Sequence, residues 1–262
     1  MLKQRIFTAV IAVAVLGIVL FVAPPAVAEA VIALLIIAGA WEWSGFLQAT
    51  GQRQKTAFLI TLVVLVGIAS AASEQQVELV LQAALAWWFI AFVWTFLYPT
   101  PIPAVIRWVG GMLVLVPLYL ALVELYQAGP LTLLFLLLIV WAADIGAFFA
   151  GKAFGRVKLA PQISPGKTWE GVIGGLVLVV LLTVARSFVI DSNLASLIPF
   201  CLAVAAISIV GDLTVSMFKR SAGLKDSGRL FPGHGGILDR IDSVAAAAPL
   251  FVLGMHWLET LQ

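Results

Sequence analysis

Long apolar segments, separated by short polar or proline- and glycine-containing segments, dominate the pattern of hydrophobic and polar positions along the 262-residue chain. A helix that crosses a membrane needs about 20 predominantly apolar residues. Nine segments come close to this length, at roughly 4–22, 26–46, 57–73, 77–97, 104–126, 130–152, 168–190, 196–215 and 244–261. The pattern therefore predicts an all-α integral membrane protein, built as a bundle of about nine transmembrane helices.

Composition supports a membrane protein and excludes an ordinary soluble enzyme. Hydrophobic residues make up 63% of the chain and charged residues only 11%, about half the charged share of soluble domains. The single cysteine, Cys201, rules out an intramolecular disulfide. The start of the chain also resembles a signal peptide, with Ala26-Val27-Ala28 as a cleavage site. We favour an uncleaved first span, because the charge distribution requires nine spans.

The distribution of basic residues predicts the orientation in the membrane. If the N-terminus is cytoplasmic, every lysine and arginine except Arg186 falls at the cytoplasmic side of the nine predicted spans. Cytoplasmic loops of membrane proteins carry an excess of these residues. We therefore expect the N-terminus in the cytoplasm and the C-terminus outside.

The longest polar segment of the chain, residues 216–242, contains five basic residues, three aspartates and one of the two histidines. Lysine and arginine suit phosphate groups, aspartate suits a hard divalent cation, and glycine lets backbone N–H groups approach an anion closely. The segment predicts metal-assisted chemistry on phosphates at a membrane surface. The alternative is a solvated charged loop that only sets the topology.

Two other polar features lie at the same side of the predicted bundle. Asp144 lies in the inner part of the sixth span, where a carboxylate is costly unless it is paired or hydrated. It is either a functional group or a structural partner for a lysine. Residues 163–171 contain Gly166-Lys167-Thr168, but Pro161 replaces the glycine that a Walker A loop requires. Lys167 and Thr168 could bind phosphate at the start of the seventh span, or they could serve as an interface anchor and a helix cap.

Helical spacing groups the polar residues near the end of the eighth span. Asp212, Ser216, Lys219 and Arg220 would lie on one helix face. Asp239 and Asp242 would share a face if a helix begins there. Carboxylates opposite lysine and arginine fit a Mg²⁺–phosphate site, because Mg²⁺ keeps several waters and binds few protein carboxylates. His234 could contact phosphate, transfer a proton or brace the loop, and a lone histidine argues against zinc.

Residues 216–242 resemble the motif of the phosphatidate cytidylyltransferase family, also called CDP-diacylglycerol synthases. The motif reads Ser-x-x-Lys-Arg, four residues, Lys-Asp, then Pro-x-His-Gly-Gly and Asp-Arg-x-Asp. Its fixed positions are all present, as Ser216, Lys219, Arg220, Lys225, Asp226, Pro232, His234, Gly235, Gly236, Asp239, Arg240 and Asp242. The segment from Ser164 to Gly171, and Asp144 with the small residues after it, also resemble family segments.

The resemblance implies an enzyme that makes CDP-diacylglycerol and pyrophosphate from CTP and phosphatidate. It implies Mg²⁺, with room for a second cation, a homodimer and a multi-pass location in the bacterial inner membrane with the active site facing the cytoplasm. The chain then divides into an N-terminal transmembrane bundle, 1–126, and a C-terminal catalytic region, 127–262, with cytoplasmic loops 152–167 and 216–243. No nucleic-acid partner is expected.

The resemblance and the residue chemistry together suggest roles for the candidate residues. The expected metal ligands are Asp144, Asp212, Asp239 and Asp242. The expected phosphate-binding residues are Lys167, Lys219, Arg220, Lys225 and Arg240. Ser164, Thr168, Ser216, His234, Gly235 and Gly236 would bind or orient the nucleotide, and Asp226 belongs to the catalytic set.

Two other functions remain as alternatives. A Mg²⁺-dependent CDP-alcohol phosphotransferase would need an Asp-Gly-x-x-Ala-Arg motif with two later aspartates, and the sequence has none. A transporter of an anionic substrate would place polar residues near the bilayer midplane, often on helices interrupted in both halves of the chain. Here the polar residues gather at the predicted inner side of the C-terminal half.

Overall fold

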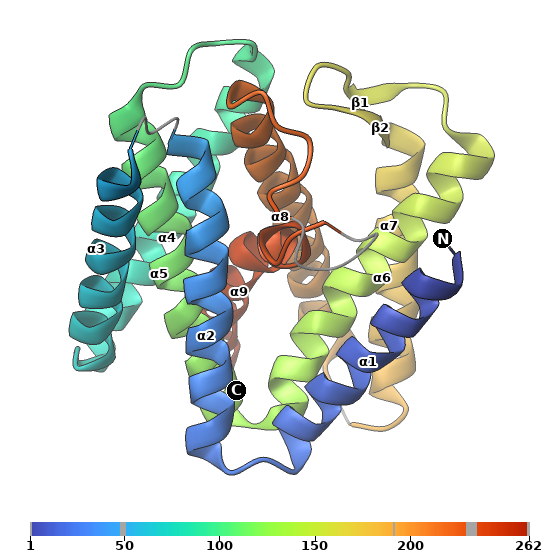
Figure 1. The fold of residues 1–262 in the computed structure, drawn as a ribbon. Coiled ribbons are helices and arrows are strands. Elements are labelled where there is room, and N and C mark those ends of the chain that lie inside the picture. Colours follow the sequence, from blue (N-terminus) through green and yellow to red (C-terminus); the bar gives the residue numbers. More distant parts are fainter. Residues whose placement is uncertain (1, 48–50, 191, 229–234, 261–262) are drawn as a thin grey trace.

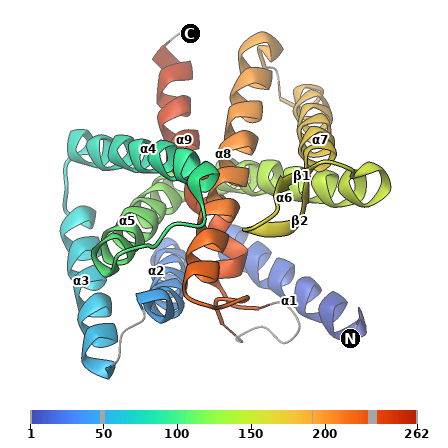
Figure 2. The same ribbon diagram turned by 90° about the horizontal axis from the view of Figure 1, so that it is seen from above.

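The computed structural model describes residues 2–47, 51–190, 192–228 and 235–260. Almost all of them are helical (Figures 1 and 2). The helices in the N-terminal half are α1 (Leu2–Phe21), α2 (Pro25–Trp43), the 3₁₀ helix η1 (Ser44–Leu47), α3 (Gln52–Ser70), α4 (Glu74–Leu97) and α5 (Ala104–Ala128). The later elements are α6 (Pro130–Phe154), β1 (Lys158–Ala160), β2 (Ser164–Thr168), α7 (Trp169–Ser187), α8 (Leu194–Ser221) and α9 (Leu238–Thr260).

The predicted all-α membrane fold is confirmed. Within the described residues, eight helices are long and apolar enough to cross a membrane. The apolar part described for α1, Val10–Phe21, is shorter than a full span. Large apolar side chains on the outer faces of the helices are exposed, as a lipid-facing surface requires.

Helices α8 and α9 lie in the middle of the bundle and pack against each other. In Figure 1, α3, α4 and α5 lie on one side of this pair and α6 and α7 on the other. Helix α9 also contacts α4, α5 and α6. The C-terminal pair is therefore surrounded by both halves of the chain.

Close helix packing depends on glycines at two contacts. In α5, a Cβ added to Gly111 would overlap the buried rings of Trp43 and Phe58. Between α6 and α7, a Cβ on Gly146 would lie 2.9 Å from the Cα of Gly175. Without a hydrophobic driving force between helices in lipid, such small residues allow the backbones to approach and pack.

Two local features differ from the prediction. Residues 158–168 form a two-stranded antiparallel hairpin of β1 and β2 instead of an irregular loop. Helix α8 continues six residues beyond the predicted membrane span, which ends at 215, and α9 starts six residues before the predicted span at 244, so both helices include the polar faces expected around Lys219 and Asp239. The reason is that polar residues of these turns face a cavity inside the bundle, so they do not need to leave the helix to avoid lipid. In Figure 1, residues 222–228 turn back from the end of α8 along the bundle, and α9 starts near mid-height.

Candidate active site

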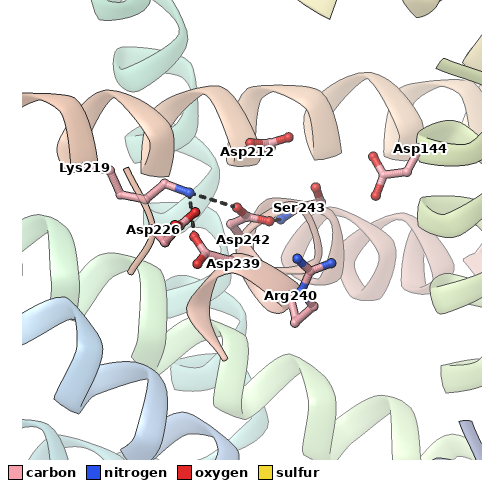
Figure 3. Close-up of a pocket in the computed structure, with 8 residues that line it drawn as sticks. All are labelled: Asp144, Asp212, Lys219, Asp226, Asp239, Arg240, Asp242 and Ser243. Carbon is pink, nitrogen blue, oxygen red and sulfur yellow. Dashed lines mark hydrogen bonds and ion pairs between the residues drawn. The ribbon is translucent and has the colours of Figure 1, made fainter. Parts of the chain in front are cut away.

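A polar cavity of about 320 Å³ lies where α6, α8 and α9 meet. Its lining consists of Asp144, Asp212, Lys219, Asp226, Asp239, Arg240, Asp242 and Ser243 (Figure 3). Five of these eight residues are aspartates, and two are basic. Carboxylates inside a helical bundle of a membrane protein are costly and mark functional sites, so this cavity is the candidate active site.

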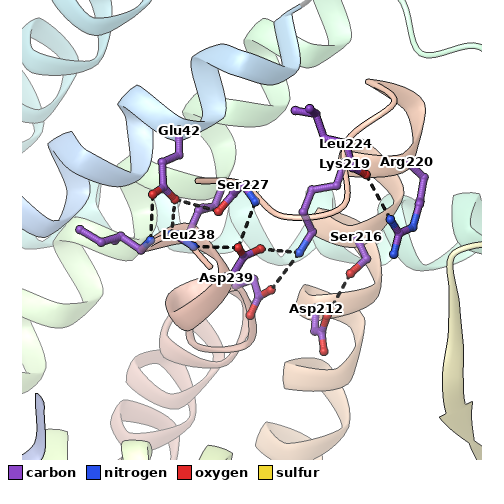
Figure 4. A network of polar contacts seen from close by, with 12 residues as sticks. Glu42, Asp212, Ser216, Lys219, Arg220, Leu224, Ser227, Leu238 and Asp239 are labelled. Atoms are coloured by element: carbon purple, nitrogen blue, oxygen red, sulfur yellow. Dashed lines mark hydrogen bonds and ion pairs between the residues drawn. The ribbon is translucent and has the colours of Figure 1, made fainter. Parts of the chain in front are cut away.

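Helix α8 supplies Asp212 and Lys219 to one wall of the cavity. Ser216, one turn after Asp212, donates its hydroxyl proton to Oδ1 of Asp212 over 3.1 Å. The predicted face of Asp212, Ser216 and Lys219 is thus present. Arg220 points elsewhere: its guanidinium donates to the backbone carbonyls of Ile163 and Leu224, both at 3.1 Å, and it ties the hairpin to the end of α8 (Figure 4).

Lys219 lies between two aspartates at the start of α9. Its Nζ is 2.6 Å from Oδ1 of Asp239 and 4.0 Å from Oδ2 of Asp242. The side chains are nearly buried, with 9–10% of each exposed. A buried ion pair is costly to desolvate, and removing one partner is strongly destabilising. Lys219 and Asp239 therefore act as one electrostatic unit, and Asp242 lies at the limit of ion-pair distance from it.

The two aspartates of α9 have different surroundings. Oδ2 of Asp239 accepts hydrogen bonds from the backbone N–H groups of Ser227 and Gly236, both at 3.0 Å. Asp239 is therefore fully engaged in holding the connection between α8 and α9. Oδ1 of Asp242 accepts only from the adjacent backbone N–H of Ser243, at 2.8 Å, among the hydrogen bonds of the described residues. Asp242 thus keeps more free acceptor capacity.

The hairpin brings Lys167 to Asp212, a residue of the cavity lining. Its Nζ is 2.6 Å from Oδ2 of Asp212. Thr168 accepts a hydrogen bond from the N–H of Gly171 over 3.1 Å and caps α7, as one of the two interpretations of this residue expects. Ser164 begins β2 and is half-buried. The hairpin therefore places the ammonium group of Lys167 against Asp212, while Thr168 serves as a helix cap.

Asp144 faces the cavity from α6, on the opposite side from Lys219 (Figure 3). No hydrogen bond or ion pair holds its carboxylate within the part of the chain that the structure describes. The structural interpretation, that Asp144 pairs with a lysine of the bundle, therefore has no support from a direct contact. Its carboxylate is available to a ligand.

Some predicted residues are not part of the cavity wall. Lys225 is exposed and does not line the cavity. Gly235 has a φ of +81°, a left-handed conformation that favours glycine, and the N–H of Gly236 is used by Asp239. His234 lies outside the described residues, so its role stays a prediction.

The donor set fits Mg²⁺, although the carboxylates are not gathered into a ready-made cage. Among the described residues, no three acidic, histidine or cysteine side chains are close enough to hold a metal ion. Mg²⁺ binds through one or two carboxylates, waters and substrate phosphates. A cavity whose possible metal ligands are carboxylate oxygens, two of them paired with lysines, is compatible with that mode, because substrate phosphates would complete the site.

Sequence reasoning missed two buried charged residues of the N-terminal half. Glu42, at the end of α2, contacts the α8–α9 connection. Arg107, in α5, donates to the carbonyls of Phe46 at 2.6 Å and Ser221 at 3.3 Å, which joins η1 to the end of α8. An ionisable residue inside an apolar run was the available signal for both.

Comparison with known proteins identifies the family of the chain. Residues 3–258 match the model of the cytidylyltransferase family. The chain is 38% identical to a phosphatidate cytidylyltransferase of Haemophilus influenzae, over 96% of the chain and 97% of that protein. It is 42% identical to one of Pseudomonas aeruginosa, over 96% of both chains. The protein therefore belongs to the cytidylyltransferase family.

Proposed function

We propose that this protein transfers CMP from CTP to phosphatidate, giving CDP-diacylglycerol and pyrophosphate. The observation that carries the proposal is the cavity lined by five aspartates, Lys219 and Arg240. It combines cation-binding and phosphate-binding groups inside a membrane bundle. The full-length similarity to relatives named phosphatidate cytidylyltransferase supports the same assignment.

The reaction exchanges one phosphoanhydride bond for another. An oxygen of the phosphatidate phosphate attacks the α-phosphorus of CTP and forms a new P–O–P bond. The bond between the α-phosphorus and the bridging oxygen breaks, and pyrophosphate leaves with its electron pair. Because phosphoryl-type transfer depends mainly on positioning and charge neutralisation, no covalent enzyme intermediate is required.

Lys219 in the cavity lining and Lys167 beside it supply positive charge. Without substrate, Lys219 contacts Asp239 and Lys167 contacts Asp212. When the triphosphate enters, each ammonium group can move from its aspartate to a phosphate oxygen. Arg240 adds another positively charged side chain to the cavity lining. Lys225 is exposed and does not line the cavity, so it would meet the phosphates only after the connection between α8 and α9 moves.

Asp212 and Asp239, released from their lysines, would then join the other cavity carboxylates in holding Mg²⁺. We assign Asp144, Asp212 and Asp242 to this task, with Asp239 joining once Lys219 has left it. A Mg²⁺ ion held by these carboxylates would supply positive charge that offsets the charge of the phosphates. The lipid tails would stay in the bilayer of the bacterial inner membrane, with the site facing the cytoplasm and the protein forming a homodimer.

Purified protein in detergent–phosphatidate micelles tests the function. We expect pyrophosphate release that requires both CTP and phosphatidate, together with a labelled CDP-diacylglycerol product when CTP carries a labelled α-phosphate. Release of CMP from CDP-diacylglycerol on adding an alcohol, without pyrophosphate formation, would instead identify a CDP-alcohol phosphotransferase. Uptake of an anion into vesicles with no product formed would identify a transporter.

A further inference from the structure

Glu42 connects the N-terminal half of the chain to the candidate active site. It lies at the end of α2, and only 9% of the residue is exposed. Its Oε2 accepts hydrogen bonds from the Ser227 hydroxyl and the Leu238 N–H, both at 2.8 Å. Its Oε1 accepts from the N–H of Ile237 at 3.0 Å. Three donors of the α8–α9 connection thus converge on one carboxylate (Figure 4).

The backbone around this carboxylate approaches too closely for any side chain. A Cβ added to Gly228 or to Gly236 would overlap the carboxylate of Glu42. Gly228 does not have a left-handed φ, so its lack of a side chain serves the close approach to Glu42. The two glycines and the three hydrogen bonds together hold the backbone closely against the carboxylate of Glu42.

The contact acts on the first turn of α9. The N–H groups at a helix start have no partner within the helix and carry partial positive charge. Glu42 takes those of Ile237 and Leu238, immediately before the cavity residue Asp239. On the other side of the connection, Asp239 takes the N–H groups of Ser227 and Gly236. The connection is therefore clamped between two carboxylates, one from α2 and one from α9 itself.

We propose that Glu42 is a positioning residue for the transfer reaction: it holds Ser227, Ile237 and Leu238 against α2 so that Asp226, Asp239 and Asp242 face the cavity. This inference rests on the proposed function of that cavity. Glu42 does not line the cavity, and it acts through the connection. It deepens the assignment by giving the N-terminal half a part in the active site.

Glu42→Gln tests the proposal with Glu29→Gln as the matched control. The glutamine keeps the volume but replaces one oxygen with an NH₂ group, so the N–H of Ile237 or Leu238 loses its acceptor. Glu29 lies on the same helix, far from the connection, and bonds to Gln127. We expect kcat to fall by about tenfold or more for Glu42→Gln, with a higher Mg²⁺ concentration needed for half-maximal rate, and no such change for Glu29→Gln.

A second readout does not depend on turnover. In metal-free protein, amide hydrogen exchange in residues 235–242 should become about tenfold faster in Glu42→Gln, because local opening of the connection becomes easier. Peptides from α3 should exchange as in the parent protein. If thermal stability falls while kcat per folded molecule and exchange in 235–242 stay unchanged, Glu42 serves only folding and the proposal is wrong. Absence of turnover in the parent protein would refute the proposed function instead, and the exchange measurement would still test the clamp.

Gly228→Ala provides an independent variant. Its Cβ should displace the carboxylate of Glu42 and reproduce the loss of kcat and the faster exchange. In a Glu42→Ala background the space is empty, so adding Gly228→Ala should cause little further loss. Such non-additivity is the signature of residues in contact. If the fold-losses in kcat of the two single variants multiply in the double variant, Gly228 and Glu42 act separately. The proposed positioning role of Glu42 would then be wrong.

Discussion

At the scale of single residues, the aspartates of the cavity differ in how they are engaged. Asp239 uses one oxygen for two backbone N–H groups and the other for Lys219. Asp242 keeps free acceptor capacity, and Asp144 faces the cavity from α6. The same residue type in one motif therefore serves two tasks, bracing the connection and binding ligands.

Asp242→Asn should remove charge from the cavity without disturbing the brace. The amide keeps the size of the side chain and its acceptor for Ser243, so expression and thermal stability should stay close to those of the parent. We expect turnover to fall by at least about a hundredfold, equal to roughly 2.7 kcal/mol of transition-state stabilisation. The rate of pyrophosphate release at saturating Mg²⁺ measures this turnover.

Two further variants serve as controls for Asp242→Asn. Glu78→Gln makes the same chemical change on the exposed face of α4 and should be silent. Asp239→Asn should lose both turnover and thermal stability, because it also breaks the ion pair with Lys219. Near-normal turnover of Asp242→Asn would remove Asp242 from the site.

At the scale of elements, the α6–α7 pair positions Asp144. The two helices touch along glycines, and a Cβ on Gly146 would lie 2.5 Å from the carbonyl oxygen of Gly174. That contact lies within one turn of Asp144. The approach of α6 to α7 therefore helps to set how far Asp144 stands from α8 and α9.

Gly146→Ala should separate the two helices and destabilise the protein by about 1–3 kcal/mol, the usual cost of overpacking. We expect earlier loss of folded protein on heating in detergent and lower turnover. Gly67→Ala on α3 is the matched control, because nothing lies within 4 Å of the added Cβ and alanine favours a helix. Equal stability of the two variants would contradict the close packing of α6 and α7.

At the scale of the whole molecule, the two halves of the chain meet at the α8–α9 connection. Arg107 of α5 holds the end of α8, and Glu42 of α2 holds the start of α9. The cavity is lined by the C-terminal half, yet the N-terminal half braces the connection that completes it. We therefore expect residues 1–126 to support the site and residues 127–262 to line it.

The orientation of the whole molecule is also open to test. A reporter active only in the periplasm should be active when fused after Gln262, and a cytoplasmic reporter should be active when inserted in residues 152–167. The reason is the positive-inside rule, because every basic residue except Arg186 is assigned to the cytoplasmic side. If both fusions report the same side, the nine-span topology is wrong.

The sequence by itself determined the membrane fold, the helices and the family. Apolar runs of spanning length have few alternatives in lipid, where every backbone group must be bonded within its own segment. The motif of residues 216–242 also pointed to the aspartates and to Lys219 that now line one cavity. These conclusions depend on patterns that are local in the chain.

Only the tertiary structure decided which charges meet. The partners of Lys219 lie 20 and more residues away, and Glu42 reaches Leu238 across 196 positions. Such pairs depend on how helices pack, and no local periodicity records them. The late end of α8 and the early start of α9 have the same origin: a polar cavity inside the bundle lets charged residues stay helical where lipid would exclude them.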